Sequence, residues 1–131
     1  MSFEIHVEHE FCAAHAIRIR GELEPVHGHN FRVTAELEGE RLDGDGLLCD
    51  FHAVHARLVE ICGPFENGSL NGTPPFDRVN PTAEHLAEHI GNSLAETYPV
   101  AGQVDGAVRV SGVRVTEAPG CVAVYRPGGG S

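Results

Sequence analysis

Apolar and polar residues alternate along two stretches near the start of the chain. In residues 3–15 the odd positions are mostly apolar and the even positions mostly polar, and residues 27–38 repeat this pattern. A period of two predicts strands with one buried and one polar face. The polar face, either solvated or lining a wet channel, is expected to carry Glu4, Glu8, Glu36 and Glu38.

Two helices are predicted between residues 50 and 99. Asp50 is the expected N-cap of the first helix, and Gly63 with Pro64 ends it. Asn80 is the expected N-cap of the second helix, with Pro81 as its first residue. Each helix has one apolar stripe. The stripe consists of Phe51, Val54, Leu58 and Ile61 in the first helix, and of Ala83, Leu86, Ala87, Ile90 and Leu94 in the second.

Two more strands are predicted, near residues 107–117 and 121–126, with a bulge at Gly112. The element order is therefore β-β-α-α-β-β, without repeats. The simplest packing lays both helices on one face of a four-stranded antiparallel sheet, which is an α+β fold. We expect a single domain over residues 1–127 and a flexible glycine-rich tail over residues 128–131.

Composition excludes several classes of protein. The 131 residues contain nine Lys and Arg against nineteen Asp and Glu, a formal net charge of −10, so no basic surface for nucleic acid is expected. No apolar run reaches membrane-spanning length, and the acidic, alternating N-terminus does not fit a signal peptide. The four cysteines form no C-x-x-C pair, which predicts free thiols and a cytoplasmic protein. They are Cys12, Cys49, Cys62 and Cys121.

The nine histidines are the unusual feature of the composition. His27 and His29 lie two apart on a predicted strand and therefore point the same way. His15 continues the apolar face of the other predicted strand. Three imidazoles at the ends of neighbouring strands can meet around one ion, and three protein ligands with an open fourth position are typical of catalytic zinc. Alternatively, the H-x-H pair is a coincidence and each ring is simply hydrogen-bonded.

Other candidate metal ligands are less convincing. His85 and His89 belong to an H-x-x-E-H sequence, but they lie opposite the apolar stripe and are expected to face solvent. His6 and His9 lie on opposite faces of one strand. His55 lies beside apolar helix positions, which predicts a core histidine. Residues 43–46 lack the ligands of a calcium loop and read as a turn.

Two motifs carry a family resemblance. The sequences F-C-A-A-H at residues 11–15 and V-H-G-H-N-F at residues 26–31 resemble the 6-pyruvoyl-tetrahydropterin synthases and their 6-carboxy-tetrahydropterin synthase relatives. The likeness continues in order at residues 49–51, 80–84 and 115–117. It implies a tunnelling fold, in which subunits join edge to edge into a barrel as a homotrimer or homohexamer.

The same resemblance implies a zinc-dependent lyase that acts on the side chain of a reduced pterin. Zn²⁺ would be held by the three histidines of the two motifs. A glutamate anchors the pterin ring in this family, and by position this is Glu117. Thr82 and Glu84 can line the same pocket, although a role at the start of the second helix fits them equally well.

Two departures from the family pattern change the expected chemistry. Leu23 occupies the position of the family's catalytic cysteine, and Glu66 with Asn67 replaces an Asp-His pair in the loop between the helices. Glu22 and Glu24 flank the vacant position, and either is a candidate replacement base. A carboxylate base favours proton removal from a side-chain hydroxyl and retro-aldol cleavage. Two alternatives remain open: a catalytically inactive pterin-binding protein and a zinc-stabilised structural oligomer.

Overall fold

Two long strands form the centre of the sheet. Strand β1 (Phe3–His15) pairs antiparallel with β4 (His27–Gly39) over its whole length. Strand β6 (Arg109–Ala118) pairs with the other side of β4, and β7 (Cys121–Tyr125) completes that edge. The computed structural model describes residues 1–99 and 108–128. Position 107 of the predicted third strand and residues 129–131 of the predicted tail lie outside this range.

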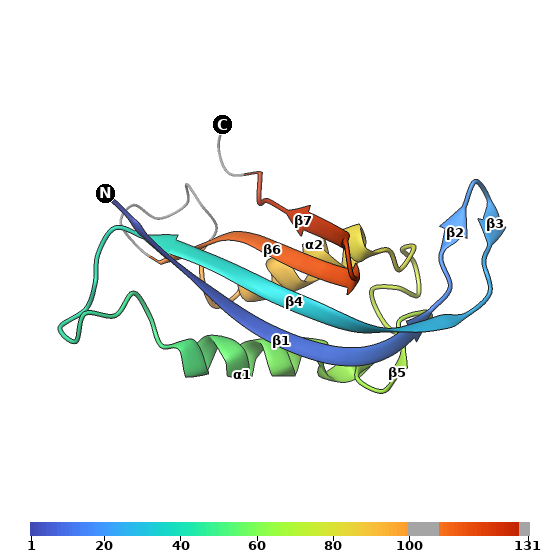
Figure 1. Ribbon diagram of the computed structural model, residues 1–131, viewed down its shortest axis with the longest axis horizontal. Coiled ribbons are helices and arrows are strands. Elements are labelled where there is room, and N and C mark those ends of the chain that lie inside the picture. Colours follow the sequence, from blue (N-terminus) through green and yellow to red (C-terminus); the bar gives the residue numbers. More distant parts are fainter. Residues whose placement is uncertain (100–107, 129–131) are drawn as a thin grey trace.

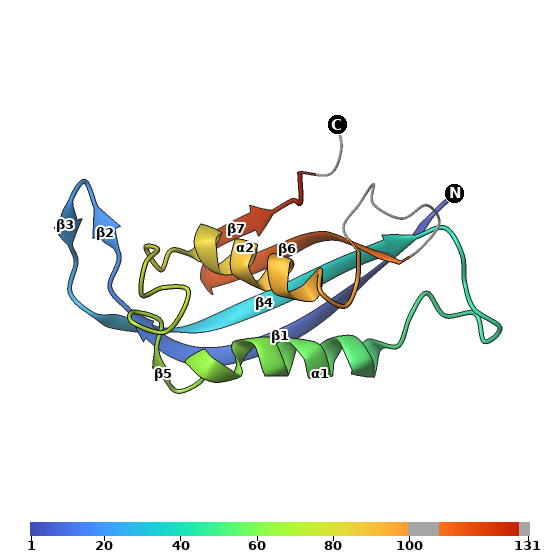
Figure 2. The same ribbon diagram turned by 180° about the vertical axis from the view of Figure 1, so that it is seen from behind.

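Both helices cover the same face of the sheet, as predicted (Figures 1 and 2). Helix α1 (Phe51–Cys62) packs along β1, and α2 (Ala83–Leu94) packs on β6 and β7. Their buried stripes meet the odd-numbered positions of β1 and β4, and the hydrophobic core forms between these layers. In the described part of the chain, neither helix has the length and apolarity needed to cross a bilayer.

The first helix begins as predicted, and the second does not. The Asp50 side chain accepts a hydrogen bond from the His52 amide and caps α1. Helix α2 is capped by Thr82, whose hydroxyl accepts from the His85 amide at 3.1 Å. The prediction of Asn80 as cap was wrong because its side chain is hydrogen-bonded to the backbone of Arg18 instead.

The sheet is mixed, whereas the sequence predicted four antiparallel strands. A short strand, β5 (Gly68–Ser69), pairs in parallel with the end of β1. The segment predicted as a plain loop after β1 contains a hairpin of β2 (Arg18–Ile19) and β3 (Glu22–Leu23). A 3₁₀ turn, η1 (Gly63–Phe65), follows α1. Strands of two residues carry no periodicity, so tertiary pairing alone defines them.

Two predicted positions on α1 are more exposed than expected. His55 was predicted to lie in the core, and Phe51 to belong to the apolar stripe. In the structure His55 is exposed, and Phe51 is 51% exposed. The buried face of α1 consists of Val54, Leu58, Ile61 and Cys62. Cys62 thus takes part in the buried face, and Phe51, in the first turn of α1, does not.

The predicted bulge is confirmed next to Gly112. The β4–β6 register shifts between Glu36 and Leu37, which leaves Ser111 without an opposite residue. Glu36, on the polar sheet face, is only 2% exposed and is bound by Arg114 and Arg126. Burial alone would raise the pKa of Glu36, but the hydrogen bonds and charge of the two arginines outweigh burial and lower it.

Candidate metal and substrate site

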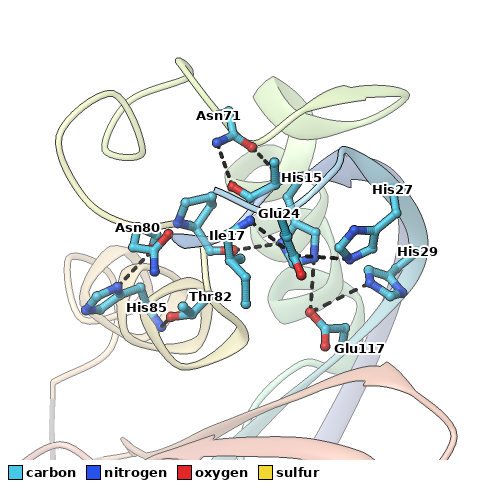
Figure 3. A network of polar contacts seen from close by, with 12 residues as sticks. His15, Ile17, Glu24, His27, His29, Asn71, Asn80, Thr82, His85 and Glu117 are labelled. Carbon is cyan, nitrogen blue, oxygen red and sulfur yellow. Dashed lines mark hydrogen bonds and ion pairs between the residues drawn. The ribbon is translucent and has the colours of Figure 1, made fainter. Parts of the chain in front are cut away.

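Strand register brings the three predicted histidines together (Figure 3). His15 lies directly opposite His27 across β1 and β4, and His29 is two residues further along β4 on the same face. The centroids of the three rings are 4.7–5.1 Å apart. One ring nitrogen from each histidine lies within 4.8 Å of the other two.

Backbone carbonyls orient two of these rings. His15 Nδ1 lies 2.8 Å from the carbonyl oxygen of Pro81, and His27 Nδ1 lies 3.0 Å from that of Pro25. A carbonyl oxygen only accepts hydrogen bonds, so in both rings Nδ1 is the donor. The Nε2 lone pair of the neutral ring is then free for a ligand, which is the usual second-shell arrangement of metal-binding histidines.

Two nitrogen atoms at the centre of the cluster lack a hydrogen-bond partner. Within the described residues, Nε2 of His15 and Nε2 of His29 are the buried side-chain polar atoms without a hydrogen bond. Glu117 Oε1 lies 3.1 Å from His15 Nε2, but this contact lacks hydrogen-bond geometry. Unsatisfied buried nitrogens are costly unless something binds them. The cluster therefore fits a cation that accepts nitrogen ligands.

The electrostatics of His29 also fit this role. Burial lowers the pKa of His29, and the neighbouring His15 and His27 lower it further against the opposing charge of Glu117. The neutral form of an imidazole is the one that binds a metal. His29 is thus held in the protonation state that a metal ligand needs.

Glu117, the predicted ring anchor, lies at the mouth of the histidine cluster. Its carboxylate is 27% exposed and approaches His29 Nε2 at 3.8 Å. It lines a pocket of about 590 Å³ together with His29. On its other side, a pocket of about 210 Å³ is lined by Glu84, Glu117 and Cys121. Cys121 was not among the predicted site residues, and the tight turn after β6 brings it to this position.

Thr82 and Glu84, the other predicted substrate contacts, differ in placement. Glu84 is exposed and lines the smaller pocket beside Glu117. The hydroxyl of Thr82 is used in capping α2 and lines neither of these two pockets. The structure thus places Thr82 at the helix N-terminus and Glu84 beside the candidate substrate site.

The two candidate bases lie in different environments. Glu24 Oε1 accepts a hydrogen bond from the Ile17 amide at 3.1 Å and lies 3.6 Å from His27 Nε2 (Figure 3). Glu22 is exposed in strand β3. Leu23, at the position of the family's cysteine, is 57% exposed. Only Glu24 is brought to the histidine cluster.

The chain between His15 and Glu24 is held by the side chains of Asn71, which was not among the predicted residues, and Asn80, which was predicted to cap α2 instead (Figure 3). Asn71 accepts from the Ala16 amide at 2.8 Å and donates to its carbonyl at 2.9 Å. Asn80 makes the same pair of bonds with Arg18, at 2.8 and 2.9 Å. Each side-chain amide replaces a backbone partner, so this segment is fixed although it lies outside the main sheet.

The replaced Asp-His positions have a structural role here. Asn67 adopts a positive φ of 56°. Its backbone N–H donates a hydrogen bond to the Cys12 carbonyl at 2.7 Å, just before β5. Asparagine tolerates this left-handed conformation better than most residues. The loop between the helices is thus anchored to β1, without an imidazole at this position.

The prediction that the two histidines of the H-x-x-E-H sequence face solvent was wrong. His85 and His89 are half-buried, not solvent-facing. His89 packs edge-on against Phe65 and Phe76, which the loop after α1 supplies, and burial lowers its pKa. His85 Nδ1 is bound to the Asn80 carbonyl at 2.8 Å. Both histidines therefore have packing or hydrogen-bonding roles.

A second group of possible ligands lies on the polar sheet face. Donor atoms of Glu4, His6 and Glu36 are within 4.8 Å of one another. Both oxygens of Glu36 are already bound by Arg114 and Arg126, which compete with any cation. The three-histidine cluster is therefore the stronger candidate for a metal.

The sequence of the chain is similar to those of two known enzymes. The chain is 32% identical over 132 residues to 6-carboxy-5,6,7,8-tetrahydropterin synthase of Bacillus subtilis, covering 96% of this chain and 86% of the relative. It is 30% identical over 89 residues to dihydroneopterin monophosphate aldolase of Pyrococcus furiosus, covering 68% of this chain and 72% of the relative.

Solved structures show the same fold. The 6-pyruvoyl tetrahydropterin synthase of Caenorhabditis elegans superposes with a TM-score of 0.81 at 16% identity, covering 97% of this chain and 96% of that one. A Plasmodium vivax 6-pyruvoyltetrahydropterin synthase, described as a catalytic-residue mutant in which a glutamate is replaced by alanine, gives 0.73 at 20% identity, covering 97% and 98%.

The sequence profile described as 6-pyruvoyl tetrahydropterin synthase matches residues 4–128, almost the whole chain. This range includes both histidine motifs, Glu117 and all strands of the main sheet apart from Phe3, the first residue of β1. With the fold and the histidine cluster in agreement, the chain belongs to the 6-pyruvoyl tetrahydropterin synthase family.

Proposed function

We propose that the protein is a zinc-dependent lyase that cleaves a carbon–carbon bond in the side chain of a reduced pterin. The observation that carries this proposal is the pair of buried, unpartnered Nε2 atoms of His15 and His29, which face a third imidazole from His27. Three neutral nitrogen ligands and an open position are typical of catalytic zinc. The activities for which the relatives are named supply the substrate class.

His15, His27 and His29 are the proposed zinc ligands. When bound, zinc supplies Lewis-acid polarisation of substrate oxygens, which eases loss of their protons. The carbonyls of Pro81 and Pro25 keep the His15 and His27 rings aimed at the centre of the cluster.

Glu24 is the proposed base. Its carboxylate is fixed by the Ile17 amide and lies beside the histidines, within reach of a side-chain hydroxyl bound there. The proton of the hydroxyl on the second side-chain carbon, counted from the ring, passes to Glu24, and that carbon becomes a carbonyl. The bond between the first and second side-chain carbons breaks, its electron pair moves towards the pterin ring, and the first carbon takes up a proton. The products are a hydroxymethyl pterin and a small aldehyde.

Two observations favour this reaction over that of the synthases. The exposed Leu23 cannot remove a carbon-bound proton as a cysteine thiolate does. An aldolase is among the relatives. The Plasmodium vivax protein, itself named a 6-pyruvoyltetrahydropterin synthase, is described with a glutamate as a catalytic residue, so a carboxylate can serve catalysis in this fold. Carboxylate chemistry thus has precedent in proteins similar to this chain.

Glu117 is the proposed anchor of the pterin ring. Its carboxylate can accept paired N–H bonds from the guanidine-like edge of the ring. Glu117 is close to His15 and His29, and Glu24 is close to His27. A substrate bound by its ring at Glu117 therefore has its side chain at the histidines and the hydroxyl of its second side-chain carbon near Glu24.

The test is to incubate the zinc-loaded protein with dihydroneopterin and its phosphates and to separate the products by chromatography. We expect a shortened hydroxymethyl pterin. Glu24→Gln should lower kcat by about 10²–10⁴-fold, the usual contribution of a general base. Glu22→Gln is the matched control, with the same change in the same hairpin region but on an exposed side chain, and should stay within about twofold.

The outcomes separate the candidate functions. Strong 6-pyruvoyl product from the wild type would show that the base is misassigned. Pterin binding without any turnover would support the alternative, an inactive pterin-binding protein, which the exposed Leu23 favours. Absence of both binding and turnover would leave a structural role for the histidine cluster.

We also propose that the protein acts as a homotrimer or homohexamer. In the described residues the sheet ends at β5 and β7, and β7 has exposed Val122 and Val124. An unpaired edge invites pairing with another strand, and ring closure of identical subunits removes such edges.

A further inference from the structure

Residues 80–82, just before α2, contact both halves of the proposed site (Figure 3). On one side, the carbonyl oxygen of Pro81 accepts a hydrogen bond from His15 Nδ1 at 2.8 Å. On the other side, the side-chain amide of Asn80 binds the backbone N–H and carbonyl of Arg18 at 2.8 and 2.9 Å. This short segment therefore contacts both a proposed zinc ligand and the stretch of chain that leads to the proposed base.

Ile17 connects the backbone of Arg18 to the proposed base. Its N–H donates to Glu24 Oε1 at 3.1 Å, and its carbonyl accepts from the Glu24 backbone N–H at 3.0 Å. Both chain neighbours of Ile17 are held by asparagine side chains, and Asn80 is the one that binds Arg18. The position of the Glu24 carboxylate thus depends on bonds that fix Ile17 from both sides.

His85, in the first turn of α2, holds residues 80–82 against the helix. Its Nδ1 lies 2.8 Å from the Asn80 carbonyl oxygen, and since a carbonyl only accepts, Nδ1 is the donor. The same carbonyl accepts from the Thr82 N–H at 2.8 Å, so both of its lone pairs are used. The backbone N–H of His85 donates to the Thr82 hydroxyl at 3.1 Å. His85 thus fixes the segment through its side chain and through its backbone.

The segment between these bonds has little freedom of its own. Pro81 is buried, and its ring fixes φ at about −65°. Once the residues on both sides of Pro81 are held, the direction of its carbonyl towards His15 is set as well. A shift of the segment would turn the His15 ring and move Ile17 in the same event. Misplacement by about 1 Å can lower a catalytic rate about 100-fold.

We propose that Asn80 and His85 are positioning residues that couple the two halves of the site, because the segment they hold places the His15 ring and the Glu24 carboxylate together. The proposal rests on the proposed function, since it takes His15 as a zinc ligand and Glu24 as the base. Both residues act through others: His85 through the backbone of Asn80, and Asn80 through the backbone of Arg18. The first histidine of the H-x-x-E-H sequence therefore serves the site without binding a metal.

The first test compares three substitutions of His85 by zinc affinity, measured in competition with a chelator. In H85N the side-chain amide nitrogen takes about the place of Nδ1 and can donate to the Asn80 carbonyl, whereas the amide in H85Q lies near the place of Nε2 and H85A has no donor. H85A and H85Q should bind zinc about tenfold more weakly, and H85N should stay within about threefold of wild type. Alanine is the best helix former, so a loss in H85A does not come from a weaker helix.

H89A is the matched control. His89 is also half-buried on α2, but its ring packs against Phe65 and Phe76. This variant should lower the melting temperature, followed by circular dichroism, and leave zinc affinity within about twofold. Equal losses of zinc affinity in H85A and H89A would show a merely structural effect and overturn the proposal. A zinc affinity in H85N as low as in H85A would overturn it too.

The second test removes the bonds between Asn80 and Arg18. Hydrogen exchange in N80A, followed by mass spectrometry in peptides covering residues 16–24, should be at least about tenfold faster than in wild type. N92A is the control, because Asn92 lies on α2 and accepts from the Tyr125 hydroxyl at 3.4 Å, and it should leave this exchange unchanged. With dihydroneopterin as substrate, N80A should lower kcat about tenfold and change KM less than about threefold. Unchanged exchange in N80A would refute its positioning role.

Zinc affinity and hydrogen exchange are measured without a pterin, so they separate this proposal from the proposed function. If wild type converts no pterin while the substitutions change both quantities as expected, the positioning role stands and the lyase fails. If wild type cleaves dihydroneopterin and the substitutions change neither quantity, the positioning role is wrong and the lyase stands. Absence of zinc binding in the wild type would overturn both.

Discussion

Glu117 lies close to the histidines, and one substitution separates its two possible roles. Its carboxylate approaches His15 Nε2 at 3.1 Å and His29 Nε2 at 3.8 Å, so it can act either as a further metal ligand or as the ring anchor. Glu117→Gln keeps the shape and removes the charge. Three imidazoles remain in this variant, so we expect zinc content within about threefold of wild type at limiting free zinc.

The effect on pterin affinity follows from the bonds that are lost. A hydrogen bond to a charged group contributes about 1.5–3 kcal/mol, and a neutral one about 0.5–1.5 kcal/mol. Glu117 is 27% exposed, so solvent weakens the difference between a charged and a neutral hydrogen bond at this place. We therefore expect a total loss of binding free energy near the lower limit, about 1.5 kcal/mol. This corresponds to a Kd for dihydroneopterin about tenfold higher.

The assay is fluorescence titration of dihydroneopterin, with zinc measured on the same samples by atomic absorption. Glu84→Gln is the matched control, because it makes the same change on an exposed carboxylate of the pocket that Glu117 also lines. It should raise Kd by less than about threefold. Loss of zinc in Glu117→Gln would identify Glu117 as a metal ligand, and an unchanged Kd would refute its role as the anchor.

Three further predictions concern the metal, the assembly and the stability of the sheet. Purified protein should contain about one zinc per chain, and the His27→Ala/His29→Ala double variant should lose it by the same measurement; full retention would contradict the ligand assignment. Light scattering should give a trimer or hexamer, and a stable monomer at micromolar concentration would contradict edge pairing. Glu36→Gln should lower the free energy of unfolding in urea at pH 7 by about 1–3 kcal/mol. This range already allows for solvent, which weakens the two ion pairs of Glu36 because Arg114 and Arg126 are half-exposed. Because the pKa of Glu36 is lowered in the folded protein, its contribution to the free energy of unfolding is complete above the ordinary glutamate pKa and is lost as the pH falls below that value. The free energies of unfolding of wild type and variant should therefore converge in acid.

Strand periodicity predicted that the three histidines share one face of the sheet, and it left open whether they bind an ion. Once residues 3–15 and 27–38 are assigned to strands with buried odd positions, His15, His27 and His29 must lie on the core side. The structure adds the register, which sets His15 directly opposite His27. The choice of Glu117 required the family resemblance, because a single carboxylate near a strand end has no pattern of its own.

Elements defined by tertiary contacts were not predictable from the sequence. The β2–β3 hairpin and β5 are too short to show a period. Asn80 has the side chain of an N-cap, but the hydrogen bonds to Arg18 compete for it and Thr82 takes the cap. His89 was expected in solvent because helical spacing cannot show that the loop carrying Phe65 and Phe76 folds back over it.

The antiparallel pairing of His15 with His27 has a consequence for the order of folding. All three histidines belong to one pair of strands, closed by residues 16–26, whereas Glu117 arrives on β6 from the far end of the chain. Closing a loop of about ten residues takes only about 10–100 ns and has a small entropic cost. A zinc ion held by these side chains would therefore tie β1 to β4 in their native register before the rest of the sheet exists. In this protein the catalytic metal would also act as a folding nucleus, and refolding should slow down when a chelator is present.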